Sequence, residues 1–200
     1  MEFERDERLG FKDTKGRLIT IAARLFREKG YKATSLREIA DLMGIQKASL
    51  YYYIKNKEEL LVEVTKRGIP FIMKPIEEIM TLSIPPREKL SRMIRAHLMA
   101  IEVTRDNALV ALLERRWLPP KELEEYLQQR KRYERYMNKV LEEGIAAGDF
   151  PVVDVKLTTF SILGMINWVN QWYDPEGPLP LEKIADTYVE LIVERMLGKK

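Results

Sequence analysis

Residues 47–57, KASLYYYIKNK, hold three consecutive tyrosines and three lysines without an acidic residue. At about 100° per residue of helix, Leu50 and Ile54 lie one above the other and form the face that a helix here must bury. Tyr51 and Tyr52 then point away from that face. A phenol hydroxyl donates and accepts hydrogen bonds, and an ammonium group donates them. The segment is therefore suited to a polar or anionic partner, and phosphate is the favoured one.

Lys57 supports this expectation because it occupies the first position of the helix that follows Asn56. The positive end of a helix dipole disfavours a cation there by roughly a few tenths of a kcal/mol, and it suits an anion such as phosphate. Two other interpretations remain open. One is that Lys57 is merely solvated, and the other is that the exposed tyrosines bind another protein.

Two short helices and a tight turn are expected to position the tyrosines. Apolar residues at helical spacing predict a first helix over about 14–28. Ser35, followed three residues later by Glu38, is the capping-box pattern that starts a helix. Gly44 ends this second helix, and only two residues separate it from a third helix over about 47–53. The arrangement is a helix-turn-helix candidate, although many helical hairpins share it.

The rest of the chain is also predicted to be helical, because the alternating pattern of strands is absent. Asn56 is expected to cap a long fourth helix, with Glu59 at the box position. Pro70 and Pro75 are expected to kink or divide that helix. Further helices are expected near residues 86–103, 106–117, 120–147, 152–174 and 181–197, with Asp106 as a cap and Gly144 and Gly148 near the end of the longest. The fold class is therefore all-α, with about nine helices.

Composition excludes several classes of protein. The 200 residues include no cysteine, which excludes disulfides, thiolate metal sites and cysteine nucleophiles. The single histidine, His97, is expected to be a packed helical residue. We find no glycine-rich phosphate loop and no metal-ligand spacing. We therefore do not expect an enzyme, and no catalytic residue, cofactor or metal site is predicted.

Positive charge is concentrated in the N-terminal third. Residues 1–67 hold 15 Lys and Arg against 11 Asp and Glu, whereas residues 68–200 hold 19 against 20. This asymmetry suggests a basic module attached to a neutral body. The charged start, residues 1–17, lacks the apolar middle of a secretion signal, and no apolar run approaches the ~18 residues of a membrane helix. We expect a cytoplasmic protein without membrane contact.

The segment ATSLREIADLMGIQKASLYYYIKNKEELL resembles the DNA-binding segment of the TetR family of transcriptional regulators. The resemblance covers about residues 14–65, and its separate elements agree in order and spacing: Thr34-Ser35, Ile39-Ala40, Gly44-Ile45, Leu50-Tyr51-Tyr52-Tyr53-Ile54 and Lys57-Glu58-Glu59-Leu60. Two positions depart from the family pattern. Gln46 stands where a serine often caps the third helix, and Ile54 replaces a common phenylalanine.

This resemblance implies a helix-turn-helix DNA-binding domain of three helices over residues 1–60. Residues 61–200 would form a larger helical domain for ligand binding and dimerisation. The third helix would enter the major groove of double-stranded DNA, where lysine can donate to guanine and small residues can pack on a thymine methyl. Residues near base edges would be Gln46, Lys47, Ala48 and Ser49. Phosphate contacts would come from Tyr51, Tyr52, Tyr53 and Lys57, and from Thr34, Ser35 and Arg37.

A second resemblance concerns residues 160–192, FSILGMINWVNQWYDPEGPLPLEKIADTYVELI. They are similar to the C-terminal region of TetR-like regulators of fatty-acid, steroid or aromatic-acid breakdown, which implies an acyl-CoA effector. Cations and aromatic rings suit the phosphates and adenine of CoA, and the candidates are Arg115, Arg116, Trp117, Arg130, Tyr133, Trp168 and Trp172. The alternatives are that the tryptophans only pack and that the arginines belong to a solvated helix face.

The family resemblance also implies a homodimer formed through the last two helices. One short recognition helix contacts too few bases for useful specificity, and a dimer doubles the number of bases contacted. A palindromic operator is therefore expected. The expected function is a repressor that a small molecule releases from DNA. A multidrug-type sensor is the main alternative for the effector, and a helical protein-interaction module is the alternative from a different class.

Overall fold

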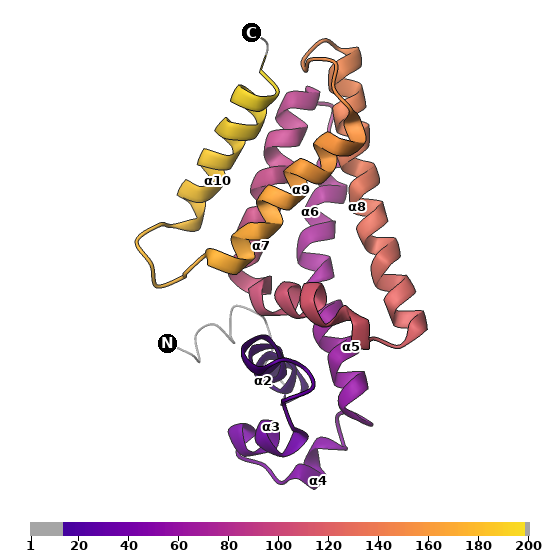
Figure 1. Ribbon diagram of the computed structural model, residues 1–200, viewed down its shortest axis with the longest axis vertical. Coiled ribbons are helices and arrows are strands. Elements are labelled where there is room, and N and C mark those ends of the chain that lie inside the picture. Colours follow the sequence, from indigo (N-terminus) through magenta and orange to yellow (C-terminus); the bar gives the residue numbers. More distant parts are fainter. Residues whose placement is uncertain (1–13, 199–200) are drawn as a thin grey trace. The chain divides into compact units, whose positions relative to one another are not determined.

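The computed structural model describes residues 14–198, and every regular element in that range is helical (Figure 1). Most of the charged N-terminal segment, on which the expectation about a secretion signal depends, lies outside the described residues. Among residues 14–198, no helix combines the length and apolar character that crossing a bilayer requires. The elements are α2 (Thr14–Lys29), α3 (Leu36–Met43), α4 (Lys47–Leu50), α5 (Lys57–Arg67), α6 (Ile69–Thr81), α7 (Pro86–Glu114), η1 (Arg115–Trp117), α8 (Pro120–Ala146), α9 (Val155–Trp172), α10 (Leu181–Val189) and η2 (Glu190–Met196). The all-α prediction is confirmed.

The described chain packs as two compact units. The first unit comprises residues 14–69 and 103–126, and the second comprises residues 70–102 and 127–198. Helix α7 contributes residues to both. The sequence predicted two helices in its place, with Asp106 as a cap, and this prediction is wrong. Asp106 lies inside α7, where its carboxylate forms an ion pair with Arg27 of α2 at 2.7 Å.

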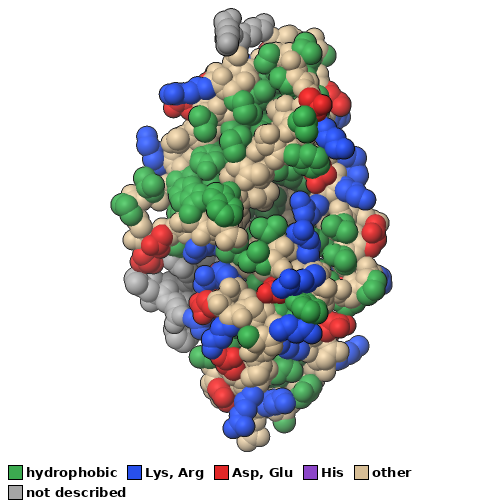
Figure 2. All heavy atoms as spheres, viewed as in Figure 1, with side chains coloured by type: hydrophobic (Ala, Val, Ile, Leu, Met, Phe, Trp, Pro, Cys, Tyr) green, Lys and Arg blue, Asp and Glu red, His purple; other side chains and the backbone are tan. Residues whose placement is uncertain are grey.

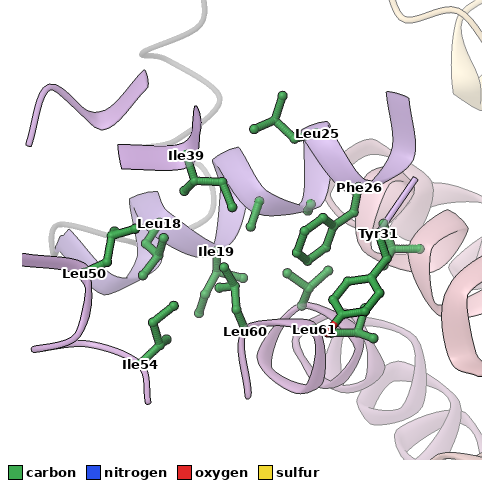
Figure 3. Packing of buried hydrophobic residues seen from close by; sticks show 14 of the residues in the cluster. Leu18, Ile19, Leu25, Phe26, Tyr31, Ile39, Leu50, Ile54, Leu60 and Leu61 are labelled. Atoms are coloured by element: carbon green, nitrogen blue, oxygen red, sulfur yellow. The ribbon is translucent and has the colours of Figure 1, made fainter. Parts of the chain in front are cut away.

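The core of the first unit is built from the apolar stripes of short helices (Figure 3). From α2, Leu18 and Phe26 point into it and are almost completely buried. Ile39 of α3 and Leu60 of α5 contribute from the other sides. Burying one such side chain is worth about 1.5–3 kcal/mol, so these contacts hold together helices that are too short to be stable alone.

Local hydrogen bonds set the ends of the short helices. The Ser35 side chain accepts from the Glu38 backbone N–H at 3.1 Å, and Gly44 ends α3 in the left-handed conformation with a φ of 69°. Asn56 caps α5 by accepting from the Glu59 N–H at 2.7 Å. The predicted starts of both helices are therefore confirmed. A side-chain cap of this kind is worth about 1 kcal/mol.

Helix α4 is shorter than expected. It ends at Leu50, and Tyr51–Tyr53 continue as a hydrogen-bonded turn in which the Tyr53 N–H donates to the Leu50 carbonyl at 2.9 Å. The Ile54 N–H donates to the same carbonyl at 3.1 Å. This turn keeps the chain close to helical geometry, so the directions expected for the tyrosines still apply.

Prolines act differently along the expected fourth helix. The chain is divided between α5 and α6 at Gly68, and Pro70 lies in the first turn of α6. Proline is well tolerated there because the first N–H groups of a helix have no helical partner. Pro75 lies inside α6 without ending it.

In the second unit, Arg87 at the start of α7 connects segments that are distant in sequence. Its guanidinium donates to the Val193 carbonyl at 2.9 Å and to the Asp149 carbonyl at 2.8 Å, and it pairs with Glu194 at 3.1 Å. The same group lies 5.6 Å from the ring of Phe150. One planar cation therefore fastens the α8–α9 connection and η2 to α7.

Gly144 has a packing role. Helix α8 continues beyond it to Ala146, and Gly148, with a φ of 73°, supplies the left-handed turn after the helix. A Cβ atom on Gly144 would lie 2.1 Å from the Phe150 ring. The glycine is required because that ring lies directly against the backbone of α8.

We expect Gly144→Ala to destabilise the protein by about 1–3 kcal/mol, since the added methyl group must displace the ring of Phe150. Urea-induced unfolding followed by circular dichroism measures the change. Gly68→Ala is the control, because a Cβ there meets only ordinary contacts and the φ of −75° suits alanine. An unchanged midpoint for Gly144→Ala would contradict the packing described here.

Candidate nucleic-acid interface

Helix α4 is anchored on one side and open on the other. Leu50 and Ile54 are buried in the core of the first unit, whereas all four residues from Gln46 to Ser49 are exposed. Gln46 precedes the helix with an extended backbone, and its side chain makes no capping hydrogen bond. The open side of α4 therefore presents an amide, an ammonium, a methyl and a hydroxyl group close together. These are groups that read base edges in a major groove.

The tyrosines follow the directions expected from the helical wheel. Tyr52 is 86% exposed and Tyr51 is 51% exposed, whereas Tyr53 is half-buried. The rings of Tyr52 and Tyr53 meet edge to face with their centroids 5.0 Å apart. Tyr53 thus supports Tyr52 from the protein side. Such an edge-to-face pair contributes about 0.5–1.5 kcal/mol beyond burial, and it restrains a phenol that is otherwise surrounded by solvent.

The three phosphate contacts predicted near the start of α3 differ in exposure. Ser35 and Arg37 are exposed. Thr34 is 2% exposed, and its hydroxyl lies within hydrogen-bonding distance of the Gly30 carbonyl at 3.0 Å and the Leu25 carbonyl at 3.2 Å. The hydroxyl of Thr34 is therefore used inside the protein, where it fastens the turn before α3 to the end of α2. A phosphate contact from this side chain does not fit the structure.

Lys57 lies half-buried at the start of α5 and already has partners. Its ammonium is 4.5 Å from the centroid of the Tyr31 ring and 3.4 Å from the Lys32 carbonyl. An aromatic face stabilises a cation, so Lys57 has a partner inside the protein that the sequence did not predict. The pKa of Lys57 is lowered, first by its partial burial and then by the positive charge of Lys32.

Lys32 is a further basic residue at this position, and its sequence context did not point to it. It is exposed, and its ammonium lies 4.0 Å from the centroid of the Trp117 ring. Because the repulsion by Lys32 exceeds the opposing attraction by Glu114 at Lys57, the neighbourhood of the two lysines favours an incoming anion. No motif singled out Lys32, since its proximity to Lys57 exists only after α2, α5 and η1 have packed together. The first unit thus combines exposed base-reading groups with two neighbouring cations.

The residues expected to bind an effector are divided between the two units. Arg115, Arg116 and Trp117 form η1 in the first unit, where the Arg116 guanidinium lies 5.4 Å from the Trp117 ring. Arg130 is half-buried on α8, in the second unit. Neither unit alone contains the whole set.

In the second unit, the three expected aromatic residues differ in environment. Tyr133 of α8 is buried, with its ring 5.6 Å from that of His97 on α7. Trp168 of α9 is 64% exposed and Trp172 is 42% exposed. The two tryptophans are therefore not part of the core within this chain. His97 is buried and helical, as the sequence predicted.

Within residues 14–198, no group of three or more His, Asp or Glu side chains is placed to hold a metal ion.

Comparison with known families agrees with this geometry. The model for bacterial regulatory proteins of the tetR family matches residues 18–64, and the model for the tetracyclin repressor-like C-terminal domain matches residues 83–196. The chain belongs to the TetR family of transcriptional regulators. It is a TetR-type transcriptional repressor with a helix-turn-helix that binds DNA, and proteins of this kind act as dimers on operators. The expectation that it is not an enzyme agrees with its relatives, which are transcriptional regulators such as the repressor KstR2.

Two relatives and one solved structure show how similar the chain is to other regulators. The transcriptional repressor KstR2 of Mycolicibacterium smegmatis is 31% identical over 179 residues, covering 88% of this chain and 87% of KstR2. The fatty acid metabolism regulator protein of Bacillus subtilis is 26% identical, covering 91% and 95% of the two chains. The solved structure of AibR in complex with isovaleryl coenzyme A and operator DNA has a TM-score of 0.79, with 28% identity over 90% of this chain and 98% of AibR.

Proposed function

We propose that this repressor binds a palindromic operator as a homodimer and that a fatty acyl-CoA or a related acyl-CoA thioester releases it. The DNA-binding part of this proposal depends on one observation about α4. Its Leu50 is buried, while the four residues from Gln46 to Ser49 face solvent. A surface of this kind can enter a major groove without disturbing the core. Gln46 and Lys47 can donate to base edges, and Ala48 can pack on a thymine methyl.

Phosphate contacts fix the position of the repressor but do not select sequence. In this proposal they come from exposed groups on both sides of α4. Tyr51 and Tyr52 supply phenols, Ser35 and Arg37 contribute from the start of α3, and Lys57 acts together with Lys32. Tyr53 supports Tyr52 rather than reaching outward itself. Thr34 is left out because its hydroxyl is used by the Gly30 and Leu25 carbonyls.

The dimer contact in this proposal is formed by α9, α10 and η2. Leu157, Phe160, Trp168 and Trp172 lie exposed along one stripe of α9, and Gly164 interrupts the stripe in its middle. Figure 2 shows hydrophobic side chains gathered on this face, over α9 and α10. Contiguous exposed apolar surface of this kind marks interaction sites. A Cβ on Gly164 would meet nothing within 4 Å, so the glycine leaves room for another helix to approach.

Three observations support an acyl-CoA effector. KstR2 and the fatty acid metabolism regulator are among the relatives, and AibR has been solved with isovaleryl coenzyme A. Arg130 is a half-buried cation on α8 that can pair with a phosphate of CoA. To release DNA, the effector must bind one arrangement of the repressor more tightly than the other. A sensor of varied hydrophobic or cationic compounds remains the alternative.

The DNA contacts are tested by mobility shift or filter binding with the DNA upstream of the protein's own gene, titrated with salt. We expect Tyr52→Ala to weaken binding to all sequences, because the lost group contacts phosphate. Lys57→Ala should lower the slope of log affinity against log salt by about one. Lys139→Ala on α8 is the control and should leave the slope unchanged. Absence of specific, salt-sensitive binding by the unmodified protein would favour the protein-interaction alternative.

The effector class is tested by thermal stabilisation with a panel of acyl-CoA thioesters, the corresponding free acids and cationic dyes. Ligand at 100 times its Kd stabilises the folded state by about 2.7 kcal/mol. We expect stabilisation by acyl-CoA thioesters, and the same compounds should release operator DNA in the mobility shift. Stabilisation by dyes but not by thioesters would support the multidrug-type alternative.

The dimer face is tested with Gly164→Arg. The side chain has free space in a single chain but would obstruct a partner helix on α9, so we expect a folded monomer in sedimentation analysis and weakened operator binding. Ala146→Arg, at the exposed last residue of α8, adds the same side chain to a different helix and is the control. A Gly164→Arg protein that remains dimeric would rule out this contact.

A further inference from the structure

A buried polar pair lies inside the second unit. His97 of α7 and Tyr133 of α8 are 5% and 7% exposed, and their rings approach to 5.6 Å between centroids. The hydroxyl of Tyr133 and the Nδ1 atom of His97 are fully buried and have no hydrogen-bond partner in the structure. Buried polar groups in proteins almost always have partners. Two such atoms on facing side chains therefore point to a missing third group.

Burial keeps both side chains neutral. It lowers the pKa of His97 to about 4, against a smaller opposing effect of a hydrogen bond with the Asn167 side chain of α9. It also raises the pKa of Tyr133, so the phenol keeps its proton. The site consequently offers no positive charge of its own to an anion, and a carboxylate or a phosphate does not suit this position.

The hydrogen-bonding capacity of the pair follows from the contact with Asn167. We assign the proton of the neutral imidazole to Nε2, with the Asn167 amide oxygen as its acceptor, because Nδ1 has no partner and a contact with Asn167 raises the pKa of His97. A neutral imidazole that carries its proton on Nε2 has a lone pair on Nδ1. The two facing side chains therefore offer one donor, the Tyr133 O–H, and one acceptor, the His97 Nδ1.

A hydroxyl group that reaches both atoms can satisfy them at once. Its oxygen accepts from Tyr133 while its own hydrogen is donated to His97. A ketone or a thioester carbonyl can only accept, so it would leave Nδ1 without a partner, and a methylene group would leave both atoms without one. Sites built to bind a hydroxyl reject analogues that lack it by large factors, because the buried polar groups are then unpaired.

The surroundings of the pair suit an apolar chain or ring. Met93 and Ile101 lie one helical turn from His97 on either side, and Met137 lies one turn from Tyr133; all three are almost completely buried. Residues four apart share one face of a helix. Methionine side chains are flexible and adapt to irregular shapes, so Met93 and Met137 can reorient around a ligand.

We propose that Tyr133 and His97 bind a hydroxyl group of the effector, so that the ligand is a hydroxylated but otherwise apolar acyl compound. The inference rests on the proposed function for the acyl-CoA class. It adds that the repressor recognises a hydroxyl group on the acyl part of the effector. His97 acts as a specificity-determining residue, positioned by Asn167. A single buried water bound to the same two atoms is the competing explanation.

The test is calorimetric titration of the full-length repressor with acyl-CoA thioesters of one chain length. The series contains hydroxyl groups at different carbons, the corresponding oxo compounds and the unsubstituted thioester. We expect at least one hydroxylated thioester to bind 10-fold or more tightly than both the oxo and the unsubstituted compounds. Tyr133→Phe, which removes only the hydroxyl, and His97→Leu should each abolish this preference.

Several results would overturn the proposal. The proposal is wrong if the unmodified protein binds all members of the series with equal affinity. It is also wrong if Tyr133→Phe loses the same factor of affinity for every ligand. A lower unfolding temperature of ligand-free Tyr133→Phe, with the hydroxyl preference retained, would indicate a buried water instead. If no thioester binds, the same comparison is made with hydroxylated and unsubstituted free fatty acids. A hydroxyl preference there supports the pair as a binding site while rejecting the CoA class, and no preference there rejects both.

Discussion

The burial of Leu50 is the constraint on which the DNA-reading part of this protein depends. Helix α4 has four residues, and helices of that length are not stable in water on their own. Leu50 is completely buried and Ile54 is 2% exposed, and both lie in the core formed with α2, α3 and α5 (Figure 3). These two side chains fix the rotation of α4 about its axis. The orientation of Gln46 through Ser49, and of the tyrosines that follow, is a consequence of that rotation.

The same logic explains what could be predicted from sequence. Periodicity and caps are local, so the stripe of α2, the caps Ser35 and Asn56, and the outward direction of Tyr52 were all predicted correctly. Thr34 shows where this reasoning fails. Serine and threonine at the start of a helix look equivalent in sequence, yet the hydroxyl of Thr34 is used by carbonyl groups of α2 and its C-terminal turn. Which of two neighbouring hydroxyls faces inward is decided by packing.

Longer-range features were missed for related reasons. Aspartate often caps a helix, so Asp106 was expected to start one. Its carboxylate instead pairs with Arg27, which is 79 positions earlier in the chain, and α7 continues through Asp106 without interruption. Lys32 gains significance only from its proximity to Lys57. Likewise, nothing in the sequence connects His97 with Tyr133, because the pairing requires α7 and α8 to pack first. Contacts between distant residues are therefore the part of the candidate sites that required a structure.

The path of the chain through the two units limits how the protein can be divided. The chain passes from the first unit to the second near residue 69, returns within α7 near residue 103, and leaves again near residue 126. Val110 and Leu118, from the returning segment, are buried in the core around α2 and α5. A fragment that stops after α5 would therefore lack part of its own hydrophobic core. Exchange of the DNA-reading part between relatives would have to carry residues 103–126 with it, so in this protein the unit that recombines is not a continuous stretch of gene.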